Sequence, residues 1–107
     1  MSQDIEDNKA IAAIGYLSIL CLIPLLMAKD SPFAQFHAKQ GLVLFIAEVV
    51  VFFLNGFLAL IPFIGWFAMV VLNIALLLLA LAGLIKAYNG EKWEMPILGA
   101  YAKKLNI

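Results

Sequence analysis

Long apolar runs separated by short polar segments dominate the pattern of the chain. The first run covers residues 10–28 and contains no charged residue. As a helix rising 1.5 Å per residue it would be about 28 Å long, close to the thickness of the hydrocarbon core of a bilayer. The segment before it is acidic overall, whereas a signal peptide opens with a positively charged segment. The pattern therefore predicts a first membrane-spanning helix over about residues 10–28.

The second run covers residues 41–85 and carries a single charged residue, Glu48. One helix of that length would be about twice as long as a bilayer is thick, so the chain must fold back. Residues 61–66 read Ile-Pro-Phe-Ile-Gly-Trp, where proline removes a helical hydrogen bond and glycine permits a turn. We expect antiparallel spans over about residues 40–61 and 66–86, which makes three spans in total.

Two segments outside these spans have the character of interfacial helices. Ser31 and Pro32 are favourable as N-cap and first helical residue, so a helix over about residues 32–39 can continue into the second span. In the tail, Pro96 opens a second short helix over about residues 96–106. Its apolar residues share one face, and two lysines flank them. The apolar residues are Ile97, Leu98, Tyr101 and Leu105, and the lysines are Lys103 and Lys104.

The composition supports a membrane location and excludes other classes. Of 107 residues, 65% are hydrophobic and 13% are charged, and the mean hydropathy is +1.03. A soluble domain of this size could not bury so much apolar surface. The net charge of +0 excludes a nucleic-acid-binding protein, and the single cysteine excludes a disulfide scaffold. The expected fold class is all-α: an integral protein of the cell (inner) membrane, in one domain over residues 1–107.

The lysines predict an orientation for this three-span arrangement. Lys9 lies on the side of the N-terminal tail and the 61–66 turn. Six lysines lie on the other side, with the 28–40 loop and the C-terminal tail: Lys29, Lys39, Lys86, Lys92, Lys103 and Lys104. Lysine-rich segments stay in the cytoplasm, so we expect the N-terminus outside and the C-terminus inside.

Polar residues within the spans are candidates for function because they are costly in lipid. His37, Gln40, Glu48 and Asn55 fall along one helical face, and Asn73 has the depth to hydrogen-bond to Asn55 across the hairpin. This intramembrane polar stripe has two interpretations: contacts between helices, or a path for ions. Glu48 is either protonated and bonded to Tyr16, Ser18 or a neighbouring subunit, or it handles ions or protons.

The chain contains none of the usual signatures of catalysis. It has one histidine and lacks a nucleophile elbow, a phosphate-binding loop and a zinc-protease motif. We therefore expect no enzyme activity, no cofactor and no bound metal. The expected partners are the lipid bilayer and either further copies of the chain or another membrane protein, because three helices shield one another only in part.

The most distinctive block of the chain is Phe-His-Ala-Lys-Gln at residues 36–40. A second distinctive segment lies in the tail, with Asn89-Gly90-Glu91 followed by Pro96-Ile97-Leu98-Gly99. Together they resemble a family of small bacterial membrane proteins related to the Tic-twenty component of the chloroplast protein translocon. Within it, the chain is similar to the magnetosome membrane proteins of the MamF/MmsF type. The motif residues are Phe36, His37, Ala38, Lys39 and Gln40.

Three functions follow from the pattern and the resemblance. The first is a non-enzymatic membrane scaffold or assembly factor that works through helix packing. The second is a subunit of an ion- or protein-translocating pore, which the polar stripe supports. The third, which the resemblance implies, is an organiser of biomineral growth in a derived internal membrane such as the magnetosome.

Overall fold

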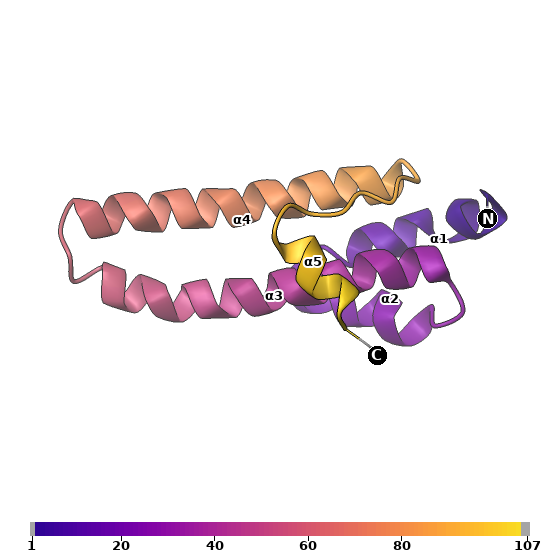
Figure 1. The fold of residues 1–107 in the computed structure, drawn as a ribbon, viewed down its shortest axis with the longest axis horizontal. Coiled ribbons are helices and arrows are strands. Elements are labelled where there is room, and N and C mark those ends of the chain that lie inside the picture. Colours follow the sequence, from indigo (N-terminus) through magenta and orange to yellow (C-terminus); the bar gives the residue numbers. More distant parts are fainter. Residues whose placement is uncertain (1, 106–107) are drawn as a thin grey trace.

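The computed structural model describes residues 2–105, and within them the chain is built of helices and loops (Figure 1). Helices α3 and α4 form a long antiparallel hairpin, and the remaining helices pack around the end of it that is opposite the turn. In chain order the elements are α1 (Ser2–Ile14), the 3₁₀ helix η1 (Ser18–Cys21), α2 (Leu22–Met27), α3 (Pro32–Leu58), α4 (Ile64–Tyr88) and α5 (Leu98–Lys103). The predicted all-α class is confirmed.

Helix α3 begins as the sequence predicts. Ser31 is extended at its N-cap position, and its hydroxyl accepts a hydrogen bond of 3.0 Å from the backbone N–H of Ala34. Pro32 follows in the first turn, where its missing N–H costs nothing. From there the helix runs without a break to Leu58, so the interfacial segment and the second predicted span are one element.

The predicted reversal near residues 61–66 is confirmed. Phe63 has a φ of 65° and a ψ of −70°, and the N–H of Ile64 donates to the carbonyl of Pro62 at 2.8 Å. This is a strained three-residue turn for a residue with a bulky side chain. Gly65 is required beside it, because a Cβ there would lie 2.0 Å from the carbonyl oxygen of Leu58. The indole N–H of Trp66 closes the turn on the carbonyl of Ala59.

The structure corrects the prediction for residues 10–28. Instead of one spanning helix, the chain ends α1 at Ile14, turns, and returns through η1 and α2. A continuous helix would place Pro24 in its interior, where the ring clashes with the carbonyl four residues earlier. In the observed arrangement Pro24 lies in the first turn of α2. Residues 2–105 therefore contain two helices long and apolar enough to cross a membrane, α3 and α4, rather than three.

This fold-back also changes where the N-terminal segment lies. The carboxylate of Asp4 accepts from the N–H of Phe33 at 3.1 Å, and the ammonium of Lys9 lies 5.7 Å from the centroid of the Tyr88 ring. Helix α1 thus lies at the same end of the hairpin as the C-terminal tail (Figure 1). The structure does not place the two tails at opposite ends, as the three-span prediction required, because the first apolar run does not traverse the molecule.

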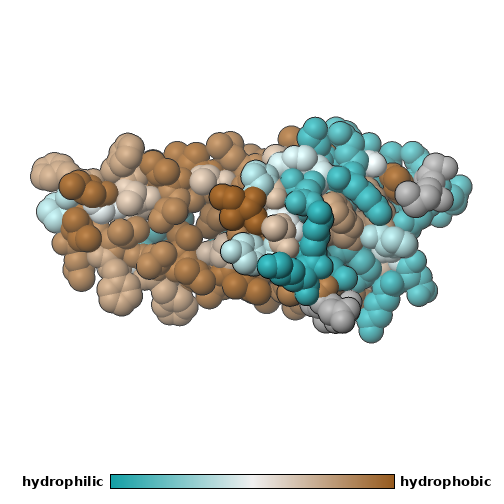
Figure 2. Space-filling view, viewed as in Figure 1, coloured by the Kyte–Doolittle hydropathy of each residue, from teal (hydrophilic) through white to brown (hydrophobic). Residues whose placement is uncertain are grey.

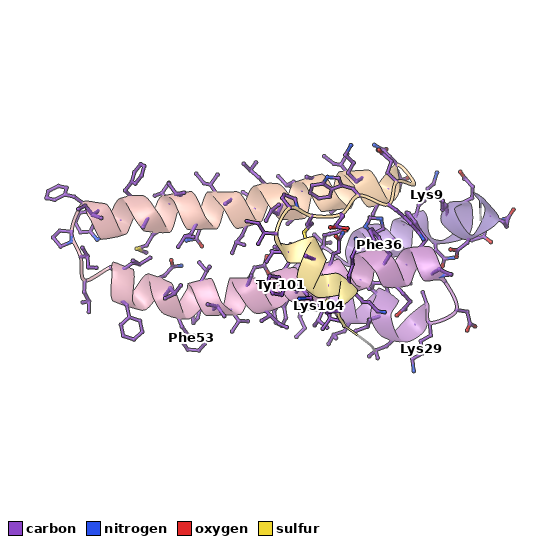
Figure 3. All side chains as sticks on the ribbon, viewed as in Figure 1. Lys9, Lys29, Phe36, Phe53, Tyr101 and Lys104 are labelled. Carbon is purple, nitrogen blue, oxygen red and sulfur yellow. The ribbon has the colours of Figure 1, made fainter. Side chains whose placement is uncertain are left out.

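Charge and apolar surface are separated along the long axis of the molecule. The molecule measures 51 × 24 × 21 Å, and Figure 2 shows its hydrophilic residues gathered at one end. Figure 3 places Lys9, Lys29 and Lys104 at that end, whereas Phe53 projects from the apolar half. No charged residue occurs between Val49 and Ile85. The surface has the pattern of a protein embedded by its α3–α4 hairpin.

The buried core lies at the charged end, where α1, α3, the end of α4 and residues 91–95 meet. It consists of Ala12, Ala13, Tyr16, Phe33, Ala34, Leu44, Ala87 and Met95. Short helix α5 lies against α3 and buries Gly99 and Ala102, while Ile97 and Tyr101 are exposed. The predicted helix over 96–106 is therefore shorter, and of its large apolar residues Leu98 packs against the core whereas Ile97 and Tyr101 do not. Residue 106 lies outside the described residues.

Candidate functional site

Two polar residues of the Phe-His-Ala-Lys-Gln block lie in the core rather than on the surface. His37 and Gln40, one turn apart on α3, are 0% and 1% exposed. Tyr16, which follows the end of α1, is 1% exposed and lies between them. Burying these polar groups is costly unless each finds a hydrogen-bond partner. Their partners define the site.

Gln40 uses both ends of its side-chain amide. The Nε2 group donates to the hydroxyl of Tyr16 at 2.7 Å and to the backbone carbonyl of Trp93 at 2.8 Å. The Oε1 atom accepts from the backbone N–H of Met95 at 2.7 Å. These contacts fix which way the amide points, because a flipped amide would set a donor against the Met95 N–H. Gln40 therefore holds residues 93–95 against α3 as a neighbouring β-strand would.

His37 continues the same network. Its Nε2 atom lies 2.7 Å from the carbonyl oxygen of Glu91, which can only accept, so Nε2 carries the proton. The Nδ1 atom is then an acceptor for the hydroxyl of Tyr16. Tyr16 in turn accepts from Gln40, so every polar atom has one consistent role. Within the described residues, no buried side-chain nitrogen or oxygen lacks a hydrogen-bond partner.

Aromatic rings enclose His37 and hold its orientation. Phe33 and Phe36 meet the imidazole edge to face, with ring centroids 4.8 and 5.0 Å away, and Tyr16 lies at 5.4 Å. We call this arrangement the His37–Gln40 lock: the side chains of Tyr16, His37 and Gln40 with the backbone of residues 91–95. Its hydrogen bonds join the turn after α1, helix α3 and the tail, and each side-chain nitrogen and oxygen in it has a hydrogen-bond partner.

The remaining residues of the predicted polar stripe lie apart from the lock. Glu48 accepts a hydrogen bond of 2.9 Å from the hydroxyl of Ser18, one of the partners that the sequence suggested. Farther along the hairpin, Asn73 donates to Asn55 at 3.1 Å, which confirms the predicted bond across it. The stripe is therefore divided into a buried lock and two separate contacts, of Glu48 with η1 and of Asn55 with α4.

Sequence reasoning missed the partners of the lock. Tyr16 was expected near Glu48, but it bonds to His37 and Gln40 instead. The other partners are backbone carbonyl and N–H groups of residues 91–95. Every residue has these groups, so the sequence of side chains does not reveal which of them will bind His37 and Gln40. One signal was available: the block at residues 36–40 and the tail segment beginning at Asn89 are the two parts of the chain that carry the family resemblance, and they are packed together.

Within residues 2–105, no three His, Cys, Asp or Glu side chains come close enough together to share a metal ion. His37 is enclosed, and Cys21 is buried in η1. The His37–Gln40 lock joins three segments of the chain at the charged end of the apolar hairpin. The fold and the site together define a small helical membrane protein.

Comparison with known proteins places the chain within that class. It belongs to the magnetosome magnetite crystal formation protein family, MamF/MmsF, which it matches over residues 7–101. It is 38% identical to magnetosome protein MamF of Paramagnetospirillum magneticum, over 84% of this chain and 78% of that protein. It is 34% identical to magnetosome protein MmsF of the same organism, over 88% of this chain and 84% of that protein.

The similarity extends beyond magnetosome proteins. A UPF0132 membrane protein of Methanocaldococcus jannaschii is 37% identical over 78% of this chain, and the match spans only 57% of that relative's length. No solved structure matches the chain. The family is therefore shown by sequence, and it contains relatives named only as membrane proteins.

Proposed function

We propose that the protein is a non-enzymatic membrane scaffold or assembly factor, which works through helix packing with further copies of itself or with another membrane protein. The observation that carries this proposal is the His37–Gln40 lock. It occupies the buried polar residues of the family block with internal hydrogen bonds. What remains for interaction is the lateral surface of the hairpin.

That lateral surface is large and apolar. On α3 and α4 the exposed aromatic residues include Phe52, Phe53, Phe57 and Phe67, each between 65% and 72% exposed. Lipid tails cover such a surface as well as a protein does, so apolar area alone does not drive association in a membrane. Polar contacts and close packing must provide the preference for a protein partner.

Glu48 supplies such a polar contact. It lies on α3 in an otherwise uncharged apolar stretch, where a carboxyl group exposed to lipid is costly. Its side chain accepts one hydrogen bond, from Ser18, and a carboxyl group can take part in several. A partner helix that supplies further hydrogen bonds would therefore be favoured over lipid at this position.

The scaffold proposal is tested by the oligomeric state in nanodiscs or mild detergent, measured by mass photometry. We expect a homo-oligomer or a copurifying membrane protein. Glu48→Gln keeps the hydrogen bonds and the assembly, whereas Glu48→Leu removes them and weakens it. Glu6→Leu, a change at the exposed and charged end, is the matched control. A monodisperse monomer of the wild type without a partner would refute the proposal.

A pore subunit is the second candidate, because Glu48, Asn55 and Asn73 are polar groups within the apolar half of the molecule. Flux measured in liposomes separates the two functions. A scaffold gives no proton or cation flux above that of empty liposomes. A pore gives flux that disappears in a Glu48→Gln variant of unchanged oligomeric state, because only the acid can change its charge.

The names of the relatives support a more specific setting for the scaffold. Two relatives in Paramagnetospirillum magneticum are named magnetosome proteins, and the family is described by magnetite crystal formation. In a cell that makes such crystals, this chain would organise the membrane around the mineral. Restoration of normal crystal size in a strain lacking MamF would support this role, and failure of a correctly localised chain to restore it would count against it.

A further inference from the structure

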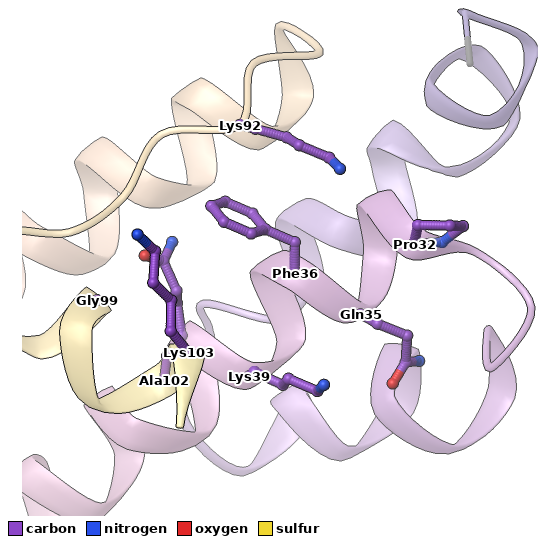
Figure 4. A pocket seen from close by; sticks show the side chains of 9 residues that line it. Pro32, Gln35, Phe36, Lys39, Lys92, Gly99, Ala102 and Lys103 are labelled. Atoms are coloured by element: carbon purple, nitrogen blue, oxygen red, sulfur yellow. The ribbon is translucent and has the colours of Figure 1, made fainter. Parts of the chain in front are cut away.

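A cavity of about 350 Å³ opens at the charged end of the molecule, between the first turns of α3, the loop at Lys92 and helix α5 (Figure 4). Its walls are the side chains of Pro32, Gln35, Phe36, Lys39, Gln40, Lys92, Gly99, Ala102 and Lys103. The side-chain amide of Gln40 is already hydrogen-bonded within the lock. The groups available to a ligand are therefore the lysines and apolar side chains such as Phe36.

The cavity is positively charged. Lys39, Lys92 and Lys103 line it, and no acidic residue does. Lys103 is paired with Glu94 at 2.6 Å on the outside, whereas the ammonium of Lys92 lies 5.8 Å from the ring centroid of Phe36. Lys39 makes no ion pair within residues 2–105. Three ammonium groups with one carboxylate partner favour an anionic occupant.

A second cavity adjoins the first. It has a volume of about 400 Å³ and lies between α2 and α3, where Leu25 and Leu26 form its apolar wall and Lys29, Gln35 and Lys39 complete the lining. Gln35 and Lys39 line both cavities, so the two meet at these side chains. Gln35 also donates to carbonyl groups at the end of α2, including that of Ala28 at 2.9 Å, which holds α2 beside α3. The site thus combines a cationic pocket with an apolar groove.

The position of the pair of cavities identifies the class of ligand. Both are lined by residues of the first turns of α3, the charged end of a helix long enough to cross a bilayer, so they lie at the level of the lipid headgroups if the hairpin spans it. Cationic pockets between helices at this level bind the headgroups of anionic lipids. A free phosphate ion would fill the cationic pocket and leave the apolar groove without a ligand.

We propose that the two cavities form one binding site for an anionic glycerophospholipid. Lys39, Lys92 and Lys103 surround its phosphate, and an acyl chain lies in the groove beside Leu25 and Leu26. The site is independent of the scaffold proposal, because a monomeric protein would bind the lipid equally well. None of the three lysines takes part in the lock, so each can be replaced without breaking it.

Lipid binding is measured by native mass spectrometry of the detergent-solubilised protein, titrated with phosphatidylglycerol or with phosphatidylcholine of the same acyl chains. We expect stronger retention of phosphatidylglycerol. Lys39→Gln and Lys92→Gln should each weaken it about fivefold, and the double variant about 25-fold, since a lysine near anionic lipid contributes roughly that factor. Retention of phosphatidylcholine should change little in all variants.

Lys104→Gln is the matched control, because Lys104 is an exposed lysine of the same tail that does not line either cavity. An equal loss in this variant would show a general effect of surface charge and overturn the proposal. Competition by inorganic phosphate at concentrations similar to those of the lipid would also overturn it, in favour of a small-anion site. Crosslinking of the wild type with a photoactivatable phosphatidylglycerol should label Leu25 and Leu26, and labelling confined to the apolar half would refute it.

Discussion

At the scale of single residues, Tyr16 occupies the central position of the hydrogen-bond network. Its hydroxyl donates to His37 and accepts from Gln40, so it links the two residues of the family block. No other group nearby can replace it, because the remaining atoms of both partners are committed to the backbone of residues 91–95. The Tyr16 oxygen therefore joins the bonds that His37 and Gln40 each make to the tail into one network.

Replacement of Tyr16 by phenylalanine tests this role. Tyr16→Phe keeps the ring but leaves Nδ1 of His37 without a donor and one N–H of Gln40 without an acceptor. We expect a loss of about 1–3 kcal/mol of stability, measured by thermal unfolding in detergent. Tyr101→Phe, on an exposed ring of α5, should change the melting temperature little. Equal effects of the two variants would show that the network contributes no stability.

The contact of Asp4 with the start of α3 should make the packing of α1 on α3 depend on pH. Hydrogen bonds from Ser31 and from the N–H of Phe33 hold the pKa of Asp4 below its usual value of 3.8. A carboxyl group whose pKa is lowered by folding stabilises the fold above the unfolded value and loses this effect as the pH falls through the folded value. We therefore expect α1 to loosen as the pH falls below about 3.8, seen as a lower protection factor of the Phe33 amide, which is its exchange relative to the intrinsic rate at the same pH.

The Asp4→Asn variant should show the lower protection factor at neutral pH, with a weaker response to acid. Asp7→Asn is the control, because Asp7 is exposed and accepts only from Gln3 within its own helix. A wild type whose protection factor at Phe33 does not change with pH would mean that the Asp4 contacts do not hold α1 in place.

Local features of single residues were predictable from sequence, and distant partners were not. The N-cap at Ser31 and the reversal around Pro62 follow from neighbours in the chain. The Asn55–Asn73 bond followed from equal distances to the turn. Apart from the Tyr16 hydroxyl, the partners of His37 and Gln40 lie more than fifty residues away and are backbone atoms, for which no side-chain pattern exists. Their burial in the core was not predicted, because the sequence placed them with Glu48 and Asn55 in a polar stripe that makes contacts between spanning helices or lines a path for ions.

At the scale of elements, the return of the chain after α1 depends on two glycines in contact. A Cβ on Gly41 of α3 would lie 1.7 Å from the carbonyl oxygen of Gly15. This approach brings the turn between α1 and η1 directly onto α3. Hydropathy is the same for a straight and for a folded apolar segment, so it could not distinguish a span over residues 10–28 from this packed pair; Pro24 was a sequence signal against a continuous helix.

Gly41→Ala should therefore destabilise the packing of α1 and η1 on α3. The added methyl group meets backbone atoms that cannot rotate away, so we expect a loss of about 1–3 kcal/mol. Gly56→Ala is a matched control on the same helix, because a Cβ there has no atom within 4 Å. Its effect should stay within about 1 kcal/mol. Thermal unfolding of both variants measures the difference, and equal stability would contradict the close contact.

At the scale of the whole molecule, separation of charge along the long axis determines how the protein can sit in a membrane. Helix α4 runs from Ile64 to Tyr88, about 37 Å at 1.5 Å per residue, which is sufficient to cross the hydrocarbon core. Helices α1, η1 and α2 leave the charged end and return to it, reaching only to the level of Glu48, which Ser18 contacts. The arrangement predicts a hairpin with two spans and a re-entrant helical pair.

This arrangement predicts that both ends of the chain lie on the same side. No lysine occurs between Lys39 and Lys86, which leaves the apolar half of the hairpin without one, and lysine-rich segments remain in the cytoplasm, so we expect the charged end to face the cytoplasm. The test uses single cysteines in a Cys21→Ala background, introduced as Gln3→Cys, Phe63→Cys and Lys104→Cys. A membrane-impermeant maleimide should label position 63 in intact cells, because Phe63 is 79% exposed at the turn of the hairpin. Positions 3 and 104 should react only after the membrane is permeabilised. Labelling of position 3 in intact cells, with position 104 protected, would instead establish three spans, because only a third crossing separates the two tails.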